Sequence, residues 1–104
     1  YAAITGTNGK TTTTALTAHL LQAGGIAALA AGNIGRALSE VALAGERPAW
    51  VALEMSSFQL HDTHDLAPAI GATTNLAPDH LDRYALQTQR AITVPLVKSM
   101  LQNE

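Results

Sequence analysis

The chain has 104 residues, the length of one compact domain, and 47% of them are hydrophobic, which argues against disorder. Charged residues make up only 13% and the formal net charge is −2, so we expect neither nucleic-acid binding nor attachment to a membrane surface. No apolar run is long enough to span a bilayer, no signal peptide is evident and cysteine is absent, which fits a cytoplasmic protein.

The hydrophobic pattern predicts strands that alternate with helices. We expect strands over residues 1–5, 26–31, 49–55 and 69–74, and helices over 10–23 and 36–44 with a short one at 58–60. A further short helix is expected to begin at 79, and 85–104 to be helical with an interruption at Pro95. Continuous apolar strands alternating with helices are typical of a parallel sheet covered on both faces, so we predict a three-layer α/β domain.

Polar side chains follow all of the expected strands. They are the loop at 6–11, then Asn33, then Glu54 with Ser56 and Ser57, and finally the block 75–80. The carboxyl ends of parallel strands meet at one edge of the sheet, where ligands bind in such folds. The sequence therefore predicts a binding site at this edge.

The loop between the first strand and the first helix is a candidate phosphate-binding loop. Gly6 and Gly9 allow a tight turn that brings backbone N–H groups close to an anion, and the helix that begins near Lys10 adds its own N–H groups. Lys10 is placed to reach the outer phosphates, and the Thr11 hydroxyl to ligate Mg²⁺. The other candidates for contacts with the nucleotide are Thr7, Asn8 and Thr12.

Two features of this loop leave alternatives open. The pattern G-x-x-x-x-G-K-[ST] requires glycine at position 4, where this chain has Ile4, so a general P-loop ATPase or kinase is the weakest interpretation. Asn8 could also have only the role of forming the turn, and Thr12 could be an ordinary residue of the first helical turn that does not contact the nucleotide.

Four motifs, in this order, closely resemble the central ATP-binding domain of the Mur ligases, which build the peptide of bacterial peptidoglycan. They are T-G-T-N-G-K-T at 5–11, G-N-I-G at 32–35, E-M-S-S-F-Q-L at 54–60 and N-L-A-P-D-H-L-D-R-Y at 75–84. The second and third blocks are most similar to the branch of the family that adds D-glutamate to UDP-N-acetylmuramoyl-L-alanine. The resemblance covers 1–84, which we interpret as a fragment of that P-loop NTPase-like domain, and leaves 85–104 as a divergent helical tail.

The resemblance implies an ATP-dependent amide ligase that uses Mg²⁺. In the family the substrate carboxylate attacks the γ-phosphate of ATP, and the amine of D-glutamate then displaces phosphate from the acyl phosphate. The implied catalytic residues are Lys10, Glu54 and His80, the implied Mg²⁺ ligands are Thr11, Glu54 and His80, and the residues implied near the muramoyl substrate are Asn33, Ser56, Ser57 and His80.

Structural roles remain open for several of these side chains. Glu54 could instead cap the following turn or form an ion pair with an arginine. His80 could instead cap or pack after Asp79. Histidine and aspartate at 61–65 have a spacing that could hold a metal, although a solvated crossover is the preferred interpretation.

The sequence also departs from the family. A carbamylated lysine that acts as a metal ligand is expected about eleven residues beyond Tyr84, where this chain has Pro95, and Lys98 could replace it only if the backbone shifts. Family members add an N-terminal domain for UDP and a C-terminal domain that closes over ATP, so we expect a piece of a longer protein that is inactive alone. Other interpretations are a fragment that binds nucleotide without turnover, and a ligase similar to folylpolyglutamate synthase.

Overall fold

The computed structural model describes residues 1–75, so the predictions for His80, the helix at 79 and the tail at 85–104 lie outside the described residues. In chain order the elements are β1 (Ala2–Thr5), α1 (Lys10–Ala23), β2 (Ala28–Gly32), α2 (Leu38–Leu43), β3 (Trp50–Glu54), α3 (Ser57–Asp62) and β4 (Ile70–Thr73). None of these helices is long and apolar enough to cross a membrane.

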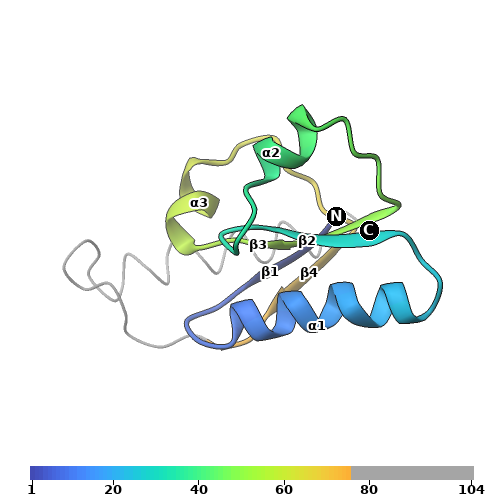
Figure 1. The fold of residues 1–104 in the computed structure, drawn as a ribbon. Coiled ribbons are helices and arrows are strands. Elements are labelled where there is room, and N and C mark those ends of the chain that lie inside the picture. The colour runs from blue at the N-terminus through green and yellow to red at the C-terminus, as the bar shows by residue number, and fades with distance from the viewer. Residues whose placement is uncertain (76–104) are drawn as a thin grey trace.

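The strands form one parallel sheet in the order β2-β3-β1-β4. Helix α1 covers one face, and α2 and α3 cover the other (Figure 1). The expected three-layer α/β architecture is confirmed.

Two apolar clusters hold the layers together, one on each face of the sheet. Successive side chains of a strand point to opposite faces, so Ala3 and Leu53 pack under α2 and α3 while Ile4 and Ala52 pack against α1. From α1, Ala18 enters the second cluster and is only 5% exposed. Small alanine side chains let the helix lie close to the strands.

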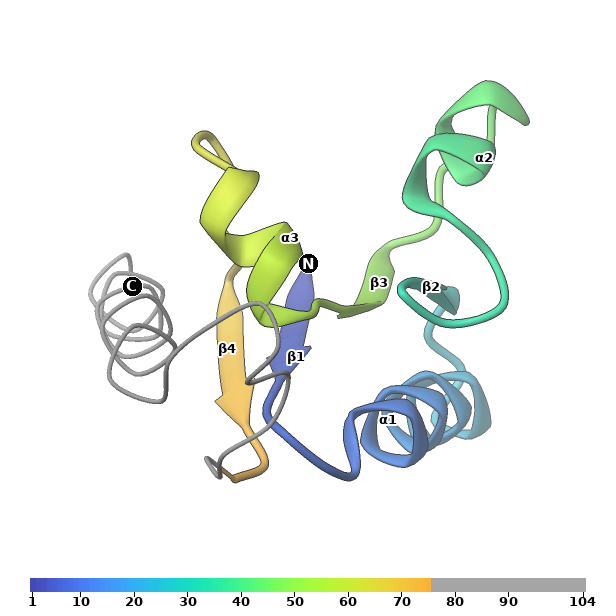
Figure 2. The same ribbon diagram turned by 90° about the vertical axis from the view of Figure 1, so that its left-hand side faces the viewer.

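The strand order determines what surrounds the loop that follows β1. Strand β1 lies between β3 and β4 in the sheet, as the turned view shows (Figure 2). In the register, Ile4 is opposite Glu54 of β3, and Thr5 is opposite Thr73 of β4. The loop after β1 is therefore flanked by Glu54 on one side and by the residues after β4 on the other.

Two elements begin two residues later than expected. Strand β2 begins at Ala28 rather than at 26, because the amide of Ile26 donates to Leu21 O at 2.9 Å and closes the end of α1. Helix α2 begins at Leu38 rather than at 36, because Arg36 O accepts from the amide of Gly32 at 2.9 Å in a tight turn. The other bounds differ by two residues or fewer from the expected ones, and those of α1 agree.

Candidate nucleotide-binding site

The loop between β1 and α1 turns on two glycines with positive φ. Gly6 has φ 140° and Gly9, directly before α1, has φ 83°. A Cβ on Gly6 would lie 2.0 Å from Thr74 Oγ1, whereas one on Gly9 would meet no atom within 4 Å. Gly6 is therefore required for space and conformation, and Gly9 for conformation alone.

The loop delivers free backbone donors to a small cavity. The cavity measures about 210 Å³ and is lined by residues 7–12 and Glu54. Within the described part of the chain, the amides of residues 9–12 donate to no protein acceptor, and the first amide engaged in α1 is that of Thr13, bound to Gly9 O at 3.0 Å. No side chain caps α1. The positive end of the helix therefore opens into this cavity.

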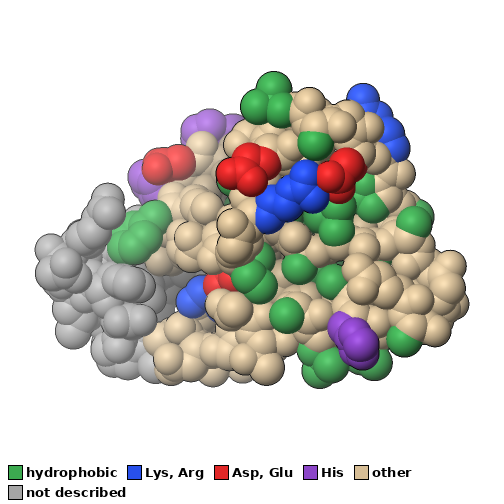
Figure 3. All heavy atoms as spheres, in the orientation of Figure 1, with side chains coloured by type: hydrophobic (Ala, Val, Ile, Leu, Met, Phe, Trp, Pro, Cys, Tyr) green, Lys and Arg blue, Asp and Glu red, His purple; other side chains and the backbone are tan. Residues whose placement is uncertain are grey.

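Lys10 lies over the loop. Its ammonium nitrogen donates to Gly6 O at 2.8 Å and to Thr7 O at 3.1 Å. An ammonium group has three donors, so one remains for an anion in the cavity that Lys10 lines. Figure 3 shows a basic and an acidic side chain next to each other in a hollow near the start of α1.

One acidic residue, Glu54 at the end of β3, lines this cavity, and only 2% of its surface is exposed. The Thr11 hydroxyl donates to its Oε1 at 3.1 Å and its Oε2 at 3.2 Å. No lysine or arginine among residues 1–75 lies within ion-pair distance of Glu54, and α3 is capped by Ser56 instead. Neither structural alternative for Glu54 is therefore found in the described part of the chain.

Asn75 and Thr74, which follow β4, brace the loop from its other side. Asn75 Oδ1 accepts from the amides of Thr7 at 3.2 Å and Asn8 at 2.9 Å, and its Nδ2 donates to Asn8 O at 3.0 Å. Thr74 Oγ1 donates to the same carbonyl at 2.6 Å. The sequence predicts Asn75 at the edge of the site but not its contacts with the loop, because these depend on the pairing of β1 with β4.

The residues expected near the muramoyl substrate are not among those that line the loop cavity. Asn33 is exposed, and its amide donates to Glu54 O at 3.0 Å, so it lies at the end of β3. Ser57 begins α3, and the Ser56 hydroxyl caps that helix. Substrate contacts by these side chains stay a prediction.

The histidine and aspartate side chains at 61–65 are at the surface. His61 Nδ1 lies 2.8 Å from Asp62 Oδ1, and the two side chains are 56% and 81% exposed. Across residues 1–75, no group of three or more such side chains is arranged to hold a metal ion.

Ser56 and Gln59 form a capping box, and this predicts a specific stability effect. Ser56 Oγ accepts from the amide of Gln59 at 3.2 Å, and Gln59 Oε1 accepts from the amide of Ser56 at 2.9 Å. We expect Ser56→Ala to lower the free energy of unfolding by about 1 kcal/mol, and Ser56→Asp to restore most of it. Thermal melts of both variants test this, and equal losses in the two would exclude the cap.

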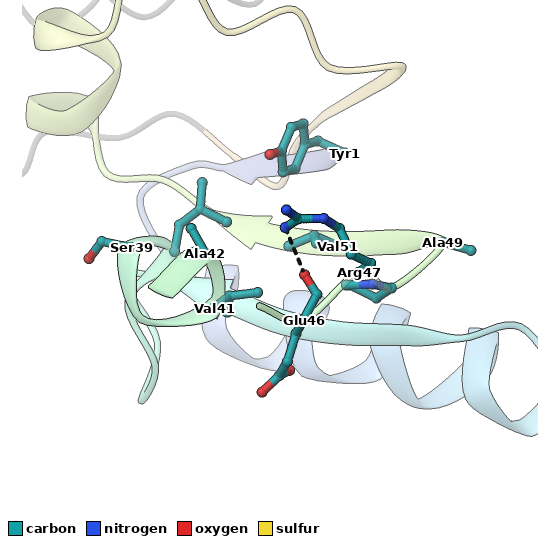
Figure 4. Close-up of a pocket in the computed structure, with 10 residues that line it drawn as sticks. Tyr1, Ser39, Val41, Ala42, Glu46, Arg47, Ala49 and Val51 are labelled. Carbon is teal, nitrogen blue, oxygen red and sulfur yellow. Dashed lines mark hydrogen bonds between the residues drawn. The ribbon is translucent and has the colours of Figure 1, made fainter. Parts of the chain in front are cut away.

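A second hollow, of about 580 Å³, lies at the amino ends of the strands, away from the loop (Figure 4). Its lining is mainly apolar: Tyr1, Leu38, Ser39, Val41, Ala42, Glu46, Arg47, Pro48, Ala49 and Val51. A side-chain hydrogen bond from Arg36, 3.0 Å long, lowers the pKa of Glu46, but both side chains are exposed. The free amides and the buried carboxylate are at the loop cavity instead, which makes that cavity the better candidate.

A parallel α/β sheet with a glycine-rich loop between its central strand and first helix has the design of a nucleotide-binding domain. A family model described as Mur ligase middle domain matches residues 4–93. The chain belongs to the Mur ligase family, which confirms the resemblance seen in the motifs.

Relatives named UDP-N-acetylmuramoylalanine–D-glutamate ligase are similar to most of this chain. The protein from Trichormus variabilis is 55% identical over 84 residues, which is 81% of this chain and 18% of the relative. That from Prochlorococcus marinus is 47% identical over 89 residues, or 81% of this chain and 19% of the relative. The chain thus spans about a fifth of the length of the curated relatives it matches.

Proposed function

We propose that this chain is the nucleotide-binding part of an ATP-dependent ligase, and that the loop at 6–12 holds the triphosphate of Mg-ATP. One observation carries the proposal: free amides at 9–12, the Lys10 ammonium and the Thr11–Glu54 oxygen pair all converge on one cavity. Amides and an ammonium group meet phosphate oxygens, and the oxygen pair meets a divalent cation.

The donor set fits Mg²⁺. This ion prefers oxygen ligands and is bound through one or two carboxylates with substrate phosphates and water. Glu54 is buried with a neutral hydroxyl as its partner, so its charge has no cation among the described residues. Bound there, Mg²⁺ would neutralise phosphate charge, with Thr11 and Glu54 as its ligands from this part of the chain and His80 as a further proposed ligand.

The names of the relatives support the specific reaction. We infer that the full-length protein joins D-glutamate to UDP-N-acetylmuramoyl-L-alanine through an acyl phosphate, for peptidoglycan synthesis in the cytoplasm. In that reaction the residues of this chain position the triphosphate and offset its negative charge, since phosphoryl transfer needs little covalent help from the protein. Domains for UDP and for closure over ATP would come from other parts of the same protein.

A second candidate is a domain that binds nucleotide without turnover. Pro95 favours it, because proline stands where the family's carbamylated lysine is expected. Release of phosphate from ATP that requires both UDP-N-acetylmuramoyl-L-alanine and D-glutamate would support the ligase. Binding of Mg-ATP with no turnover in any substrate mixture would support the second candidate.

Lys10→Ala is expected to weaken Mg-ATP binding about 100-fold, because a hydrogen-bonded ion pair to phosphate is worth roughly 2–3 kcal/mol. Titration calorimetry measures the loss. Arg47→Ala is the matched control: it removes the same charge, and Arg47 lines the second hollow, so we expect no change in affinity. Equal affinities of Lys10→Ala and the unmodified chain would refute the proposed role of the loop.

A further inference from the structure

The side chain of Asn75 makes an unusual set of contacts with the loop. Its Oδ1 accepts from two successive amides, those of Thr7 and Asn8, and its Nδ2 donates to Asn8 O. Only one orientation of the carboxamide satisfies all three, because the amides need an oxygen and the carbonyl needs an N–H. The backbone carbonyl of Asn75 is a second acceptor for Thr7 N, at 3.1 Å.

Thr74 strengthens this brace from the same strand end. Its hydroxyl donates to Asn8 O at 2.6 Å and lies 3.4 Å from Thr5 O, so one side chain touches the backbone on both sides of Gly6. The loop and the end of β4 are in such close contact that a Cβ on Gly6 would overlap Thr74 Oγ1. These contacts hold the loop in the conformation that the structure shows.

The brace also divides the amides of the loop into two groups. Those of Thr7 and Asn8 donate to Asn75, whereas those of residues 9–12, which line the cavity, have no protein acceptor in the described range. An anion at this loop thus meets a preorganised set of donors at the start of α1. Fixing donors in advance reduces the entropy lost on binding.

We propose that Asn75 is a positioning residue: it locks the loop so that the amides at 9–12, and not those at Thr7 and Asn8, receive the phosphates. This inference rests on the proposed function of the loop. It assigns to the end of β4 the role of a template for the nucleotide site, with no contact of its own to the nucleotide.

The competing possibility is that Asn75 Oδ1 occupies the place of a phosphate oxygen and must be displaced. The two possibilities predict opposite effects of removing the Asn75 side chain on nucleotide affinity. If Asn75 positions the loop, its removal weakens nucleotide binding, because the loop must then be ordered at the expense of binding energy. If Asn75 is displaced, its removal strengthens binding.

The test compares Asn75→Ala with Gln22→Ala in the full-length chain. Gln22 Nε2 donates to Ala28 O at 2.7 Å at the far end of α1, so its loss also removes a side-chain amide bond to the backbone, remote from the cavity. We expect Asn75→Ala to raise the Kd of Mg-ATP and Mg-ADP, and the KM for ATP, about tenfold with a much smaller change in kcat. Gln22→Ala should lower the melting temperature by a similar amount and leave the Kd unchanged.

Thr74→Val supplies a variant of nearly unchanged volume should Asn75→Ala fail to fold, and a Kd about threefold higher is expected for it. Unchanged or tighter nucleotide binding in the folded variants, while Lys10→Ala loses it, would overturn the positioning role and leave the proposed function intact. Failure of the unmodified full-length chain to bind Mg-ATP would instead overturn the proposed function itself.

Discussion

Replacing Glu54 with glutamine is expected to weaken Mg²⁺-dependent ATP binding by about 100-fold, which corresponds to roughly 2.7 kcal/mol, without destabilising the nucleotide-free chain. The carboxylate is 2% exposed and its described partner is the Thr11 hydroxyl, with no basic side chain within ion-pair distance among residues 1–75. A buried charge without a counter-charge costs free energy, so a neutral isostere that keeps the hydrogen bond should fold as well or better.

Calorimetric titration of ATP at several Mg²⁺ concentrations, together with thermal melts, measures both parts of this prediction. Glu46→Gln is the matched control, since it removes the same charge from an exposed carboxylate that lines the second hollow. We expect the control to leave nucleotide affinity unchanged. A fall of several degrees in the melting temperature of Glu54→Gln would mean that the carboxylate is needed for folding, and equal affinity for ATP would exclude it as a ligand.

A variant that binds Mg-ATP more weakly but is at least as stable is what a preformed ion site predicts. Glu54 is the last residue of an apolar strand, and its carboxylate is buried there, although a carboxylate with only a structural role is usually at the surface. Binding of Mg-ATP to the folded state alone would then stabilise the chain by an amount that rises with the logarithm of ligand concentration once that concentration exceeds the Kd. Sites of this kind are commonly less stable than their neutralised variants.

Local signals were sufficient for most of the elements. The bounds of α1 were predicted correctly because Gly9 and Gly24 flank an uninterrupted helical segment. The starts of β2 and α2 were predicted two residues too early, because Ile26 and Arg36 are used by hydrogen bonds that close the neighbouring turns. Such bonds depend on turn geometry that hydrophobic periodicity does not encode.

The site was predicted unevenly, for a physical reason. Lys10 and Thr11 follow directly from the loop motif, and Glu54 joins them because its strand lies next to β1. The brace from Asn75 depends on β4 being the other neighbour of β1, and strand order is a tertiary property. The roles of Lys10, Thr11 and Glu54 in binding Mg-ATP stay predictions. So do those of Asn33, Ser56, Ser57 and His80 and the domain boundary at 84, which rest on the family resemblance.

The second large effect is expected at Gly32, the last residue of β2. Gly32→Ala should lower the free energy of unfolding by about 2–4 kcal/mol, which for a domain of this size is a fall in melting temperature of at least roughly 10 °C. Gly32 has φ 103°, and a Cβ there would lie 2.3 Å from Glu54 O and 2.9 Å from Leu53 Cδ1. The nearest obstacle is backbone, so no side-chain rotation relieves it.

Gly45→Ala separates the steric contribution from the conformational one. Gly45 also has a positive φ, 71°, but a Cβ there would meet no atom within 4 Å, so we expect only about 1 kcal/mol of destabilisation. Equal losses in the two variants would show that the contact with Glu54 O has no importance. Because the amide of Asn33 is bound to that same carbonyl, a displaced Gly32 would also move the end of β3. Any Gly32→Ala protein that still folds should therefore bind Mg-ATP more weakly than Gly45→Ala, which links the turn after β2 to the position of Glu54.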